Sequence, residues 1–540
     1  MRASTHRSSG RRLIPVALLA TASLALAACG GGAGAQAPAG SPTSGGKATI
    51  AVASDAGCVD PQQVASNDTI WSTRQIVDSL TDQNPKTGEI VPWLAESWDI
   101  SPDSTAFTFH LRKGATFSDG SAVDAAAVKV NLDRAVTLGA RAGLIRGYLS
   151  GYAASTVVDP QTVTVSFKQP NAQFLQATST HSLGLLSPAS VPLSDDERCK
   201  GVIGSGPFVL GSYTPNQSVV LTKRAGYSWG SSLWKHKGAA YLDQVTFQVV
   251  PESGVRAGSL QSGESDVISS IGPQDEAAFK GTNVVLQARS NPGVVFNLGF
   301  NHQRPLGADP VVRKALSLAL DRQQIVDTVY TSQTKPATSI LASTTPMYAE
   351  QKKALGSDPK EAGKLLKDAG WVRGSDGIYA KDGRKLSLTV SWSAVIGTNK
   401  PALELIQQQA AASGIDLQLK ELQVAESASV LASGDFDIYW SNLTRADPDI
   451  LRSSYSTALA NNYRLPASDL DAALAAQAAD SDPVKRAGAA AQAQQLIVDS
   501  YDVVPVVELT TVLAHSPKIH DVTYDASSRI QLFDTWTTGG

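Results

Sequence analysis

Cysteine and histidine are scarce in this chain of 540 residues, and its net charge is small. None of the 7 histidines stands in a His-Glu-x-x-His run, so no dedicated zinc site is visible. Lys and Arg total 46 against 49 Asp and Glu, which gives a net charge of −3 without a basic stripe. Nucleic-acid binding therefore has no electrostatic support, and we expect no metal and no cofactor.

Long apolar segments are also missing. Beyond the N-terminal region, no run reaches the roughly 20 residues that a membrane-spanning helix needs. The glycines at 30–34 precede no strand–helix unit, so they do not form a dinucleotide-binding loop. Charged residues make up 18% and hydrophobic residues 42%, which is near ordinary globular levels. The roughly 490 residues after position 47 are too many for one core and predict at least two lobes.

The N-terminal region has the order of basic, apolar and small residues that is typical of a secretory signal. Four arginines precede an uncharged stretch over 13–25, and Leu26-Ala27-Ala28-Cys29 follows. This order resembles a bacterial lipoprotein signal, in which Cys29 is lipidated and becomes the first mature residue. The alternative, an uncleaved transmembrane anchor, needs roughly 20 apolar residues. We expect a lipoprotein signal peptide over 1–28 and, from its Gly, Pro and Ser content, a flexible tether over 29–47.

Two cysteines remain, Cys58 and Cys199. A pair of cysteines in an exported protein is typical of a disulfide. Here the bridge would join the loop after the first strand to a distant segment, in a structural role. Two buried thiols are the alternative.

Several segments carry recognisable local patterns. Residues 94–98 precede a run over 106–112 in which apolar and polar residues alternate, which predicts a half-buried strand. A turn-rich stretch follows, and Ser121 with Asp124 predicts a capping box that opens an amphipathic helix. Further along, Asp309-Pro310 predicts a helix start with Asp as the cap, and Val312, Ala315, Leu316 and Ala319 would form its apolar face. Other segments of the same series lie at 203–208, 260–266, 297–306, 321–324 and 434–440.

Taken in order, these segments resemble the family 5 extracellular solute-binding proteins. Members of that family are the binding components of ABC importers for oligopeptides, dipeptides, nickel complexes and some oligosaccharides. The resemblance covers roughly residues 50 to 510 and implies an α/β, two-lobed periplasmic-binding-protein fold (type II, large peptide-binding-like) with an extra subdomain in the first lobe. The implied boundaries are 48–292 and 505–540 for lobe I, about 80–202 for its extra subdomain, and 293–504 for lobe II.

The resemblance also implies a function. The protein would capture a peptide or peptide-like solute by lobe closure and deliver it to an ABC permease and its ATPase, without catalysis. It would act as a monomer on the extracellular face of the bacterial cell membrane (the periplasm or its equivalent), touching the membrane only through the lipid anchor. Alternatives with the same fold are a non-peptide ligand (oligosaccharide, metal chelate or acidic small molecule) and a surface sensor or adhesin.

The family's ligand contacts lie after the first strand, at the first crossover near 291–293, and after the Trp of the second lobe. On this chain they correspond to the loops that hold Asp55, Asn297, Arg445 and Asp447. In peptide-binding members, an Asp three residues after that Trp binds the ligand's α-amino group. Here Leu443 stands at that position, or Thr444 when the count starts from Asp447-Pro448. Neither side chain can act as a counter-ion.

Each candidate has a structural alternative. Arg445 is a rigid fork suited to a carboxylate or phosphate, and we hypothesise that it favours an acidic ligand. Alternatively, it pairs with Asp447 or Asp449 and shapes its loop. Trp392 and Trp440 end predicted strands, where they could stack on a ligand or fill the core. Asp55 could bind a cationic group or only form its turn.

One segment suggests an enzyme. Gly226-Tyr227-Ser228-Trp229-Gly230 fits the nucleophile elbow of lipases and esterases. That elbow needs an apolar helix directly after it, and residues 231–238 do not predict one. An exported serine hydrolase using Ser228 is therefore a remote alternative, and no other catalytic residue is expected.

Overall fold

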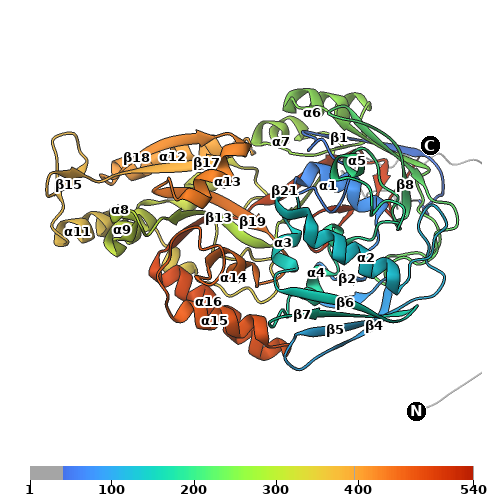
Figure 1. The fold of residues 1–540 in the computed structure, drawn as a ribbon. Coiled ribbons are helices and arrows are strands. Elements are labelled where there is room, and N and C mark those ends of the chain that lie inside the picture. Colours follow the sequence, from blue (N-terminus) through green and yellow to red (C-terminus); the bar gives the residue numbers. More distant parts are fainter. Residues whose placement is uncertain (1–39, 394–395, 539–540) are drawn as a thin grey trace, which may run out of the picture. The chain divides into compact units, whose positions relative to one another are not determined.

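The computed structural model describes residues 40–393 and 396–538. The predicted signal peptide, Cys29 and most of the predicted tether lie outside these residues. Within the described part, no helix has the length and apolar character needed to cross a membrane. The fold is α/β with two lobes, each built on its own large sheet (Figure 1).

The first lobe contains a seven-stranded sheet in which β1 is central and parallel to both neighbours, β10 and β11. In sheet order, its strands are β12 (Val285–Ser290), β21 (Thr510–His515), β11 (Val267–Ile268), β1 (Lys47–Val52), β10 (Gln244–Val249), β9 (Ser218–Lys223) and β8 (Phe208–Thr214). Its helices include α1 (Asn67–Thr73), the 3-10 helix η1 (Arg74–Ile76), α5 (Asp195–Lys200), α6 (Ser253–Ser262) and α7 (Pro273–Phe279).

An extra subdomain of the first lobe holds a four-stranded antiparallel sheet. Its strands, in sheet order, are β4 (Ala95–Ile100), β5 (Ala106–Leu111), β7 (Thr162–Phe167) and β6 (Tyr152–Asp159). Every second residue of β5 is buried, so the predicted half-buried strand is confirmed. The subdomain also contains the helices α2 (Ala125–Ala135), α3 (Ile145–Tyr148) and α4 (Phe174–Ala177) and the short strands β2 (Thr81–Gln83) and β3 (Ile90–Pro92).

The cap of α2 differs from the prediction. Asp124 is the N-cap, and its carboxylate accepts from Ala127 N at 2.8 Å. Ser121 instead belongs to the preceding turn, where its backbone N–H donates to Asp119 at 2.9 Å. The helix therefore starts three residues later than the capping-box pattern predicts, because Asp119 binds Ser121 first.

The second lobe contains a five-stranded mixed sheet. Its strands, in sheet order, are β18 (Asp416–Leu422), β17 (Ser387–Ser393), β19 (Ile438–Thr444), β13 (Gly293–Phe300) and β20 (Val503–Val507). All eight residues of β13 are buried, as expected for a strand covered on both faces. Its helices are α8 (Pro305–Ala308), α9 (Pro310–Ala319), α10 (Arg322–Val329), α11 (Pro359–Asp368), α12 (Asn399–Ala412), α13 (Val424–Ser433), α14 (Ile450–Tyr455), α15 (Asp469–Ala479) and α16 (Pro483–Ser500). Small strands complete the fold: β14 (Val372–Arg373), β15 (Tyr379–Lys381), β16 (Arg384–Lys385), β22 (Ile519–His520), β23 (Thr523–Tyr524), β24 (Ile530–Gln531) and β25 (Trp536–Thr537).

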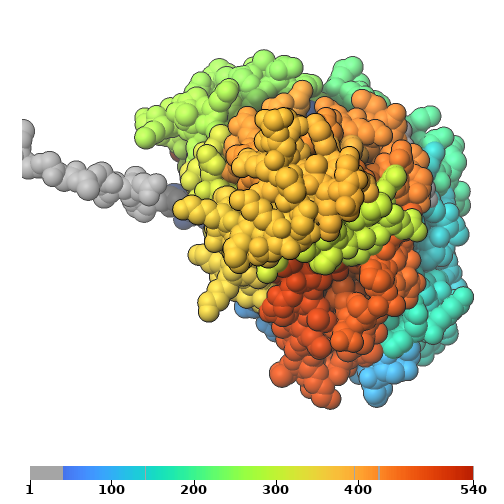
Figure 2. Space-filling model, turned by 90° about the vertical axis from the view of Figure 1, so that its left-hand side faces the viewer, coloured from blue at the N-terminus to red at the C-terminus, as the bar shows by residue number. Residues whose placement is uncertain are grey.

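The start of α9 confirms a sequence prediction. Asp309 is the N-cap, its carboxylate accepts from Val311 N at 2.9 Å, and Pro310 is the first helical residue. All four residues of the predicted apolar face are buried. Figure 2 shows the end of the second lobe, where the segment that contains α11 and β14–β16, in yellow, covers the face turned to the viewer.

Two crossings join the sheets. The first runs from β12 through Asn291 and Pro292 into β13. The expected boundary, at which lobe II ends at 504 and lobe I resumes at 505, lies inside β20, and the chain reaches the first lobe's sheet only at Thr510. Asn291 links the two crossings, because its N–H donates to Leu509 O at 2.7 Å and its side-chain oxygen accepts from Thr511 N at 3.1 Å.

A disulfide joins Cys58, in the loop after β1, to Cys199 in α5, with an S–S distance of 2.03 Å. A buried ion pair lies beside it, in which Arg198 Nη2 is 2.8 Å from Asp60 Oδ2. These contacts hold the loop after β1 against α5.

Candidate ligand-binding site

Arg445 lies between the two lobes, directly after β19 of the second lobe. Its Nη1 donates to Gln173 Oε1 of the subdomain at 3.0 Å, and its Cζ is 4.4 Å from the ring centroid of Tyr148 in α3. A cation above an aromatic face at this distance is stabilising. Beside it, Gln83 Nε2 donates to Ala446 O at 3.2 Å. The loop after β19 therefore carries contacts between the lobes.

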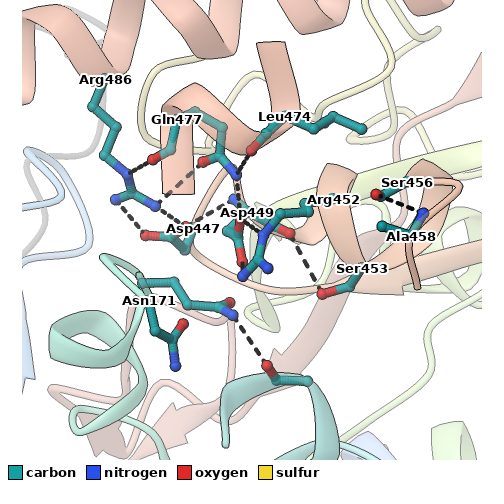
Figure 3. A network of polar contacts seen from close by, with 12 residues as sticks. Asn171, Asp447, Asp449, Arg452, Ser453, Ser456, Ala458, Leu474, Gln477 and Arg486 are labelled. Atoms are coloured by element: carbon teal, nitrogen blue, oxygen red, sulfur yellow. Dashed lines mark hydrogen bonds and ion pairs between the residues drawn. The ribbon is translucent and has the colours of Figure 1, made fainter. Parts of the chain in front are cut away.

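This loop is held by a buried network of carboxylates and cations (Figure 3). Asp447 receives both ends of the Arg486 guanidinium, at 2.6 and 2.9 Å, and Asp449 receives Arg452 Nε and Nη2, each at 2.7 Å. Gln477 also donates to Asp449. The hypothesis that Arg445 pairs with Asp447 or Asp449 is wrong, because Arg486 and Arg452 occupy those carboxylates. Asp447 supports the loop through this ion pair.

A second contact between the lobes lies below this network. Ala172 N of the subdomain donates to Ala478 O of α15 at 2.9 Å. Asn171, which precedes it, is drawn in Figure 3 on the side of the network that faces the subdomain. The turn at 171–173 thus meets the second lobe both at α15 and, through Gln173, at Arg445.

A cavity of about 380 Å³ opens beside the loop that contains Arg445. Both lobes line it, with Lys86, Arg289 and Ala526 from the first lobe and Ala446 from the second. No carboxylate is among the described residues that line it. Arg289 is fixed there, because its Nη2 donates to Pro85 O at 2.7 Å and its Nη1 to Ala526 O at 3.0 Å. The charge of this cavity lining is positive.

Two more arginines are buried on the first-lobe side. Arg74 in η1 is 1% exposed and Arg529, before β24, is 4% exposed. Gln75, next to Arg74, joins the two chain segments, because its side chain donates to Ile530 O at 2.9 Å and accepts from Leu532 N at 3.1 Å. Arg74 Nη1 donates to Ser79 Oγ at 2.8 Å, and its Cζ lies 4.6 Å from the ring centroid of Trp93.

His181 belongs to the same cluster. Ser79 Oγ, which binds Arg74, donates to the carbonyl of Thr180 at 3.0 Å, next to His181. Burial lowers the pKa of His181 well below its usual range, and the charges of Arg529 and Arg74 act in the same direction. His181 is therefore neutral at physiological pH.

The pKa of Tyr148, the residue that Arg445 contacts, is influenced by two of these cations. Burial raises the pKa of Tyr148, while the positive charges of Arg445 and Arg529 oppose that rise. Of these two cations, Arg445 lies over the ring of Tyr148, with its Cζ 4.4 Å from the ring centroid. Burial likewise raises the pKa of Asp82, and the positive charge of Arg74 opposes that rise.

Three of the expected ligand contacts lie side by side in the second lobe's sheet. Trp392 in β17 and Trp440 in β19 are register partners, and Asn297 in β13 lies opposite Ser441 in β19. Trp440 is 2% exposed, donates from Nε1 to Asn399 Oδ1 at 3.0 Å and stacks on Phe296. Trp392 is 3% exposed within the same core. Their burial favours the alternative that both tryptophans fill the core.

Asn297 and Asp55 have fixed partners. Asn297 Nδ2 donates to Val295 O at 2.8 Å, whereas its buried Oδ1 has no hydrogen-bond partner among the described residues. Asp55 accepts from Tyr213 Oη at 2.7 Å and from Asn216 N at 2.9 Å. These bonds attach the loop after β1 to the β8–β9 turn and favour a structural role for Asp55.

The nucleophile elbow predicted as a remote alternative is absent. Ser228 is exposed, and residues 228–230 form neither a strand nor a helix. His236 hydrogen-bonds Asp534 and Ala239 O instead of a serine. Within the described residues, Ser228 thus has neither the turn nor the base that such chemistry requires.

Comparison with known proteins identifies the family. The model of the bacterial extracellular solute-binding proteins, family 5, matches residues 89–464. The chain belongs to this family. Among curated relatives, this solute-binding protein is 29% identical over 442 residues to the glutathione-binding protein GsiB of Escherichia coli K12, covering 79% of this chain and 82% of that protein. It is 28% identical over 440 residues, with the same coverage, to GsiB of Salmonella typhi.

Solved structures show the same fold. NikA from Brucella suis, in complex with Fe(III)-EDTA, aligns with a TM-score of 0.79 and 24% identity over 91% of this chain and all of NikA. The oligopeptide-binding protein AppA from Bacillus subtilis, in complex with a nonapeptide, aligns with a TM-score of 0.74 and 20% identity over 92% of this chain and all of AppA. The predicted family and two-lobed fold are confirmed, and the curated relatives are binding proteins.

Sequence reasoning did not find the buried cationic residues of the first lobe or the arginine that lines the cavity. Arg74, Arg289, Arg529 and His181 stand in unremarkable local patterns, separated by up to several hundred positions. A buried arginine has the same sequence signal as a surface arginine. Only the bonds of Gln75, in η1, to Ile530 and Leu532 join the chain segments that hold Arg74 and Arg529.

Proposed function

We propose that this protein binds a peptide or peptide-like solute between its lobes and delivers it to the permease and ATPase of an ABC importer. Family membership supports the class, and the name of the glutathione-binding relatives supports a peptide-like cargo. The observation that carries the proposal is the cavity of about 380 Å³, because both lobes line it. A solute held there would couple the two lobes, and contacts such as Arg445 with Gln173 would form as they close.

We further propose that the protein is a lipoprotein on the extracellular face of the membrane. Residues 1–28 would be the signal peptide, and Cys29 would carry the lipid at the start of a tether that ends near residue 47. A Cys29→Ala variant should then leave the membrane fraction while the wild-type chain stays in it. Equal retention of both in the membrane would contradict the anchor.

A non-peptide solute is the second candidate. In peptide-binding members an Asp binds the ligand's amino group, and Leu443 stands at the matching position here, with 40% of its surface exposed. Asp447 and Asp449 cannot replace that Asp without losing Arg486 and Arg452. Asn297 and Arg445 remain proposed contacts for either kind of solute.

The decisive experiment is native mass spectrometry of the full chain, purified gently in detergent and then denatured to release any bound solute. A set of short peptides or a glutathione-like mass is the expected result. A single sugar or metal chelate would favour the second candidate. Covalent labelling of Ser228 by a fluorophosphonate probe would instead contradict a purely binding function.

A further inference from the structure

A second cavity, of about 170 Å³, adjoins the cavity proposed for the solute. Four residues line both cavities: Gln83 and Gly88 of the subdomain, and Pro346 and Ala446 of the second lobe. From these residues the smaller cavity continues between the β4–β5 turn of the subdomain and the start of α16. A solute in the larger cavity would therefore lie next to the smaller one.

The walls of the smaller cavity are mostly apolar and carry no net charge. Its apolar lining includes Ile90, Ile100, Phe107, Leu175 and Met347. Asp447 and Arg486, the charged residues of the lining within the described part of the chain, neutralise each other in their ion pair (Figure 3). An apolar cavity of about 150 Å³ holds one benzene molecule. The size and the walls therefore suit one uncharged aromatic side chain.

Two buried polar atoms of this lining have no hydrogen-bond partner among the described residues. They are Ser104 Oγ and Gln176 Oε1, and the two residues are 0% and 4% exposed. Buried polar atoms are rarely left unpaired, because each one has lost its bonds to water. An apolar cavity with two such atoms matches a group that is apolar along its length and carries one hydroxyl.

The bonds of Gln83 determine which end of the Gln176 amide is free. Gln83 Nε2 donates to the carbonyl oxygens of Gly88 at 3.1 Å and Ala446 at 3.2 Å, and these two acceptors fix the orientation of its amide. Gln83 Oε1 is therefore an acceptor, and Gln176 donates its Nε2 to it at 3.1 Å. The remaining atom, Gln176 Oε1, can only accept, so its partner must be a donor such as an O–H group.

Ser104 has a backbone conformation that favours glycine. Its φ is +54°, in the left-handed region, and its N–H donates to Ser101 O at 2.8 Å within the β4–β5 turn. Asn171 N donates to Ser104 O at 2.9 Å, which holds this turn against the segment that contacts α15. Glycine would adopt the same turn with less strain. The turn alone therefore does not explain a serine hydroxyl in the wall of the cavity.

We propose that the smaller cavity is a specificity subsite for a tyrosine-like side chain of the solute, whose hydroxyl donates to Gln176 Oε1 and accepts from Ser104 Oγ. This inference rests on the proposed binding function and specifies one part of the solute. A phenylalanine side chain would fill the same space and leave both polar atoms unpaired, and a charged side chain would be buried without a free counter-ion. Because both lobes line the subsite, a side chain bound in it would also favour the closed arrangement.

The test compares matched tripeptides on the full wild-type chain in detergent. Tyrosine stands once in Tyr-Gly-Gly, Gly-Tyr-Gly and Gly-Gly-Tyr, and each peptide has a counterpart with phenylalanine in its place. We expect at least one tyrosine peptide to bind at least tenfold more tightly than its counterpart by isothermal titration calorimetry, because the counterpart leaves buried polar atoms unpaired.

The other outcomes separate the inference from the proposed function. If the phenylalanine peptides bind as tightly at all three positions, the inference is overturned and the proposed function stands. The same holds if glutathione binds and none of the tripeptides does. Binding of neither glutathione nor any tripeptide would contradict both.

A variant and its control assign the preference to the subsite. Ser104→Gly removes the hydroxyl and suits the left-handed backbone, so it should reduce the preference for tyrosine about tenfold without lowering the melting temperature. Ser270→Gly is the matched control, because Ser270 has a φ of +56°, is exposed and lines neither cavity. An unchanged preference in Ser104→Gly, or an equal loss in Ser270→Gly, would refute the assignment.

Discussion

The ion pair between Asp447 and Arg486 gives a prediction whose size follows from the structure. The side chains are 4% and 10% exposed, and two parallel bonds of 2.6 and 2.9 Å join them. Burial is the largest influence on the pKa of Arg486 and lowers it, but the charge of Asp447, its hydrogen bonds and the charge of Asp449 together outweigh burial, so the pKa is raised. The guanidinium therefore stays charged.

Arg486→Gln would leave the Asp447 carboxylate buried with one remaining partner among the residues that the structure describes, the N–H of Asp449 at 2.8 Å. Removing one member of a buried pair typically costs about 3–5 kcal/mol, because the other charge remains without compensation. We therefore expect a loss of that size in the free energy of unfolding. Adding Asp447→Asn should restore part of the loss, since two neutral amides can bind each other.

The assay is urea unfolding followed by tryptophan fluorescence, with the two single variants and the double variant forming a cycle. Lys364→Gln is the control, because Lys364 and Asp368 form a pair 3.7 Å apart with about two thirds of each side chain exposed. An exposed pair of this kind is worth at most about 1 kcal/mol. If the double variant is less stable than Arg486→Gln by the full cost of Asp447→Asn alone, the two residues are not coupled and the reasoning fails.

Three further predictions concern stability. Replacing Cys58 and Cys199 with Ala should lower the free energy of unfolding by about 3–5 kcal/mol, because the bridge closes a loop of 141 residues; a loss below 1 kcal/mol by urea unfolding would refute this. Gly204→Ala should lower the melting temperature strongly, since its Cβ would lie 1.8 Å from Ile76 O, whereas Gly254→Ala in α6 meets nothing and should be neutral or stabilising. Burial raises the pKa of Asp78 from 3.8 to about 7, although hydrogen bonds from Trp229 and Tyr227 oppose the rise. The protonated carboxyl therefore contributes about 4 kcal/mol to the free energy of unfolding below pH 4, and this contribution is lost as the pH rises to 7. Asp78→Asn should remove this pH dependence from the stability curve of the variant, so the difference between the wild-type and variant curves should change by about 4 kcal/mol between pH 4 and pH 7.

Local patterns predicted local structure well. The Asp-Pro start of α9 and the alternation of β5 were correct, because each depends on residues only a few positions apart. The start of α2 was wrong by three residues, because Asp119 offered Ser121 a nearer partner. The return crossing was placed inside β20, since its apolar run does not reveal which sheet it joins.

The candidate site was only partly predictable. Arg445 was identified because it stands in a loop of the family pattern, but its predicted ion-pair partners were wrong. Its actual contacts, Gln173 and Tyr148, belong to the other lobe and are distant in sequence. Arg74 and Arg529 were missed altogether, since nothing local distinguishes a buried arginine from a solvated one.

By itself, the sequence determined the family, the α/β class and the positions where many helices and strands begin, because hydrophobic period, caps and turn residues act over a few positions. Tertiary structure alone decided which charges are compensated. Arg486 lies 39 positions from Asp447 and neutralises it, whereas Asp525, only four positions from Arg529, accepts from the backbone N–H of Arg529 at 2.9 Å. Charges interact through space, and the spatial neighbours of a side chain are set by the packing of the whole chain.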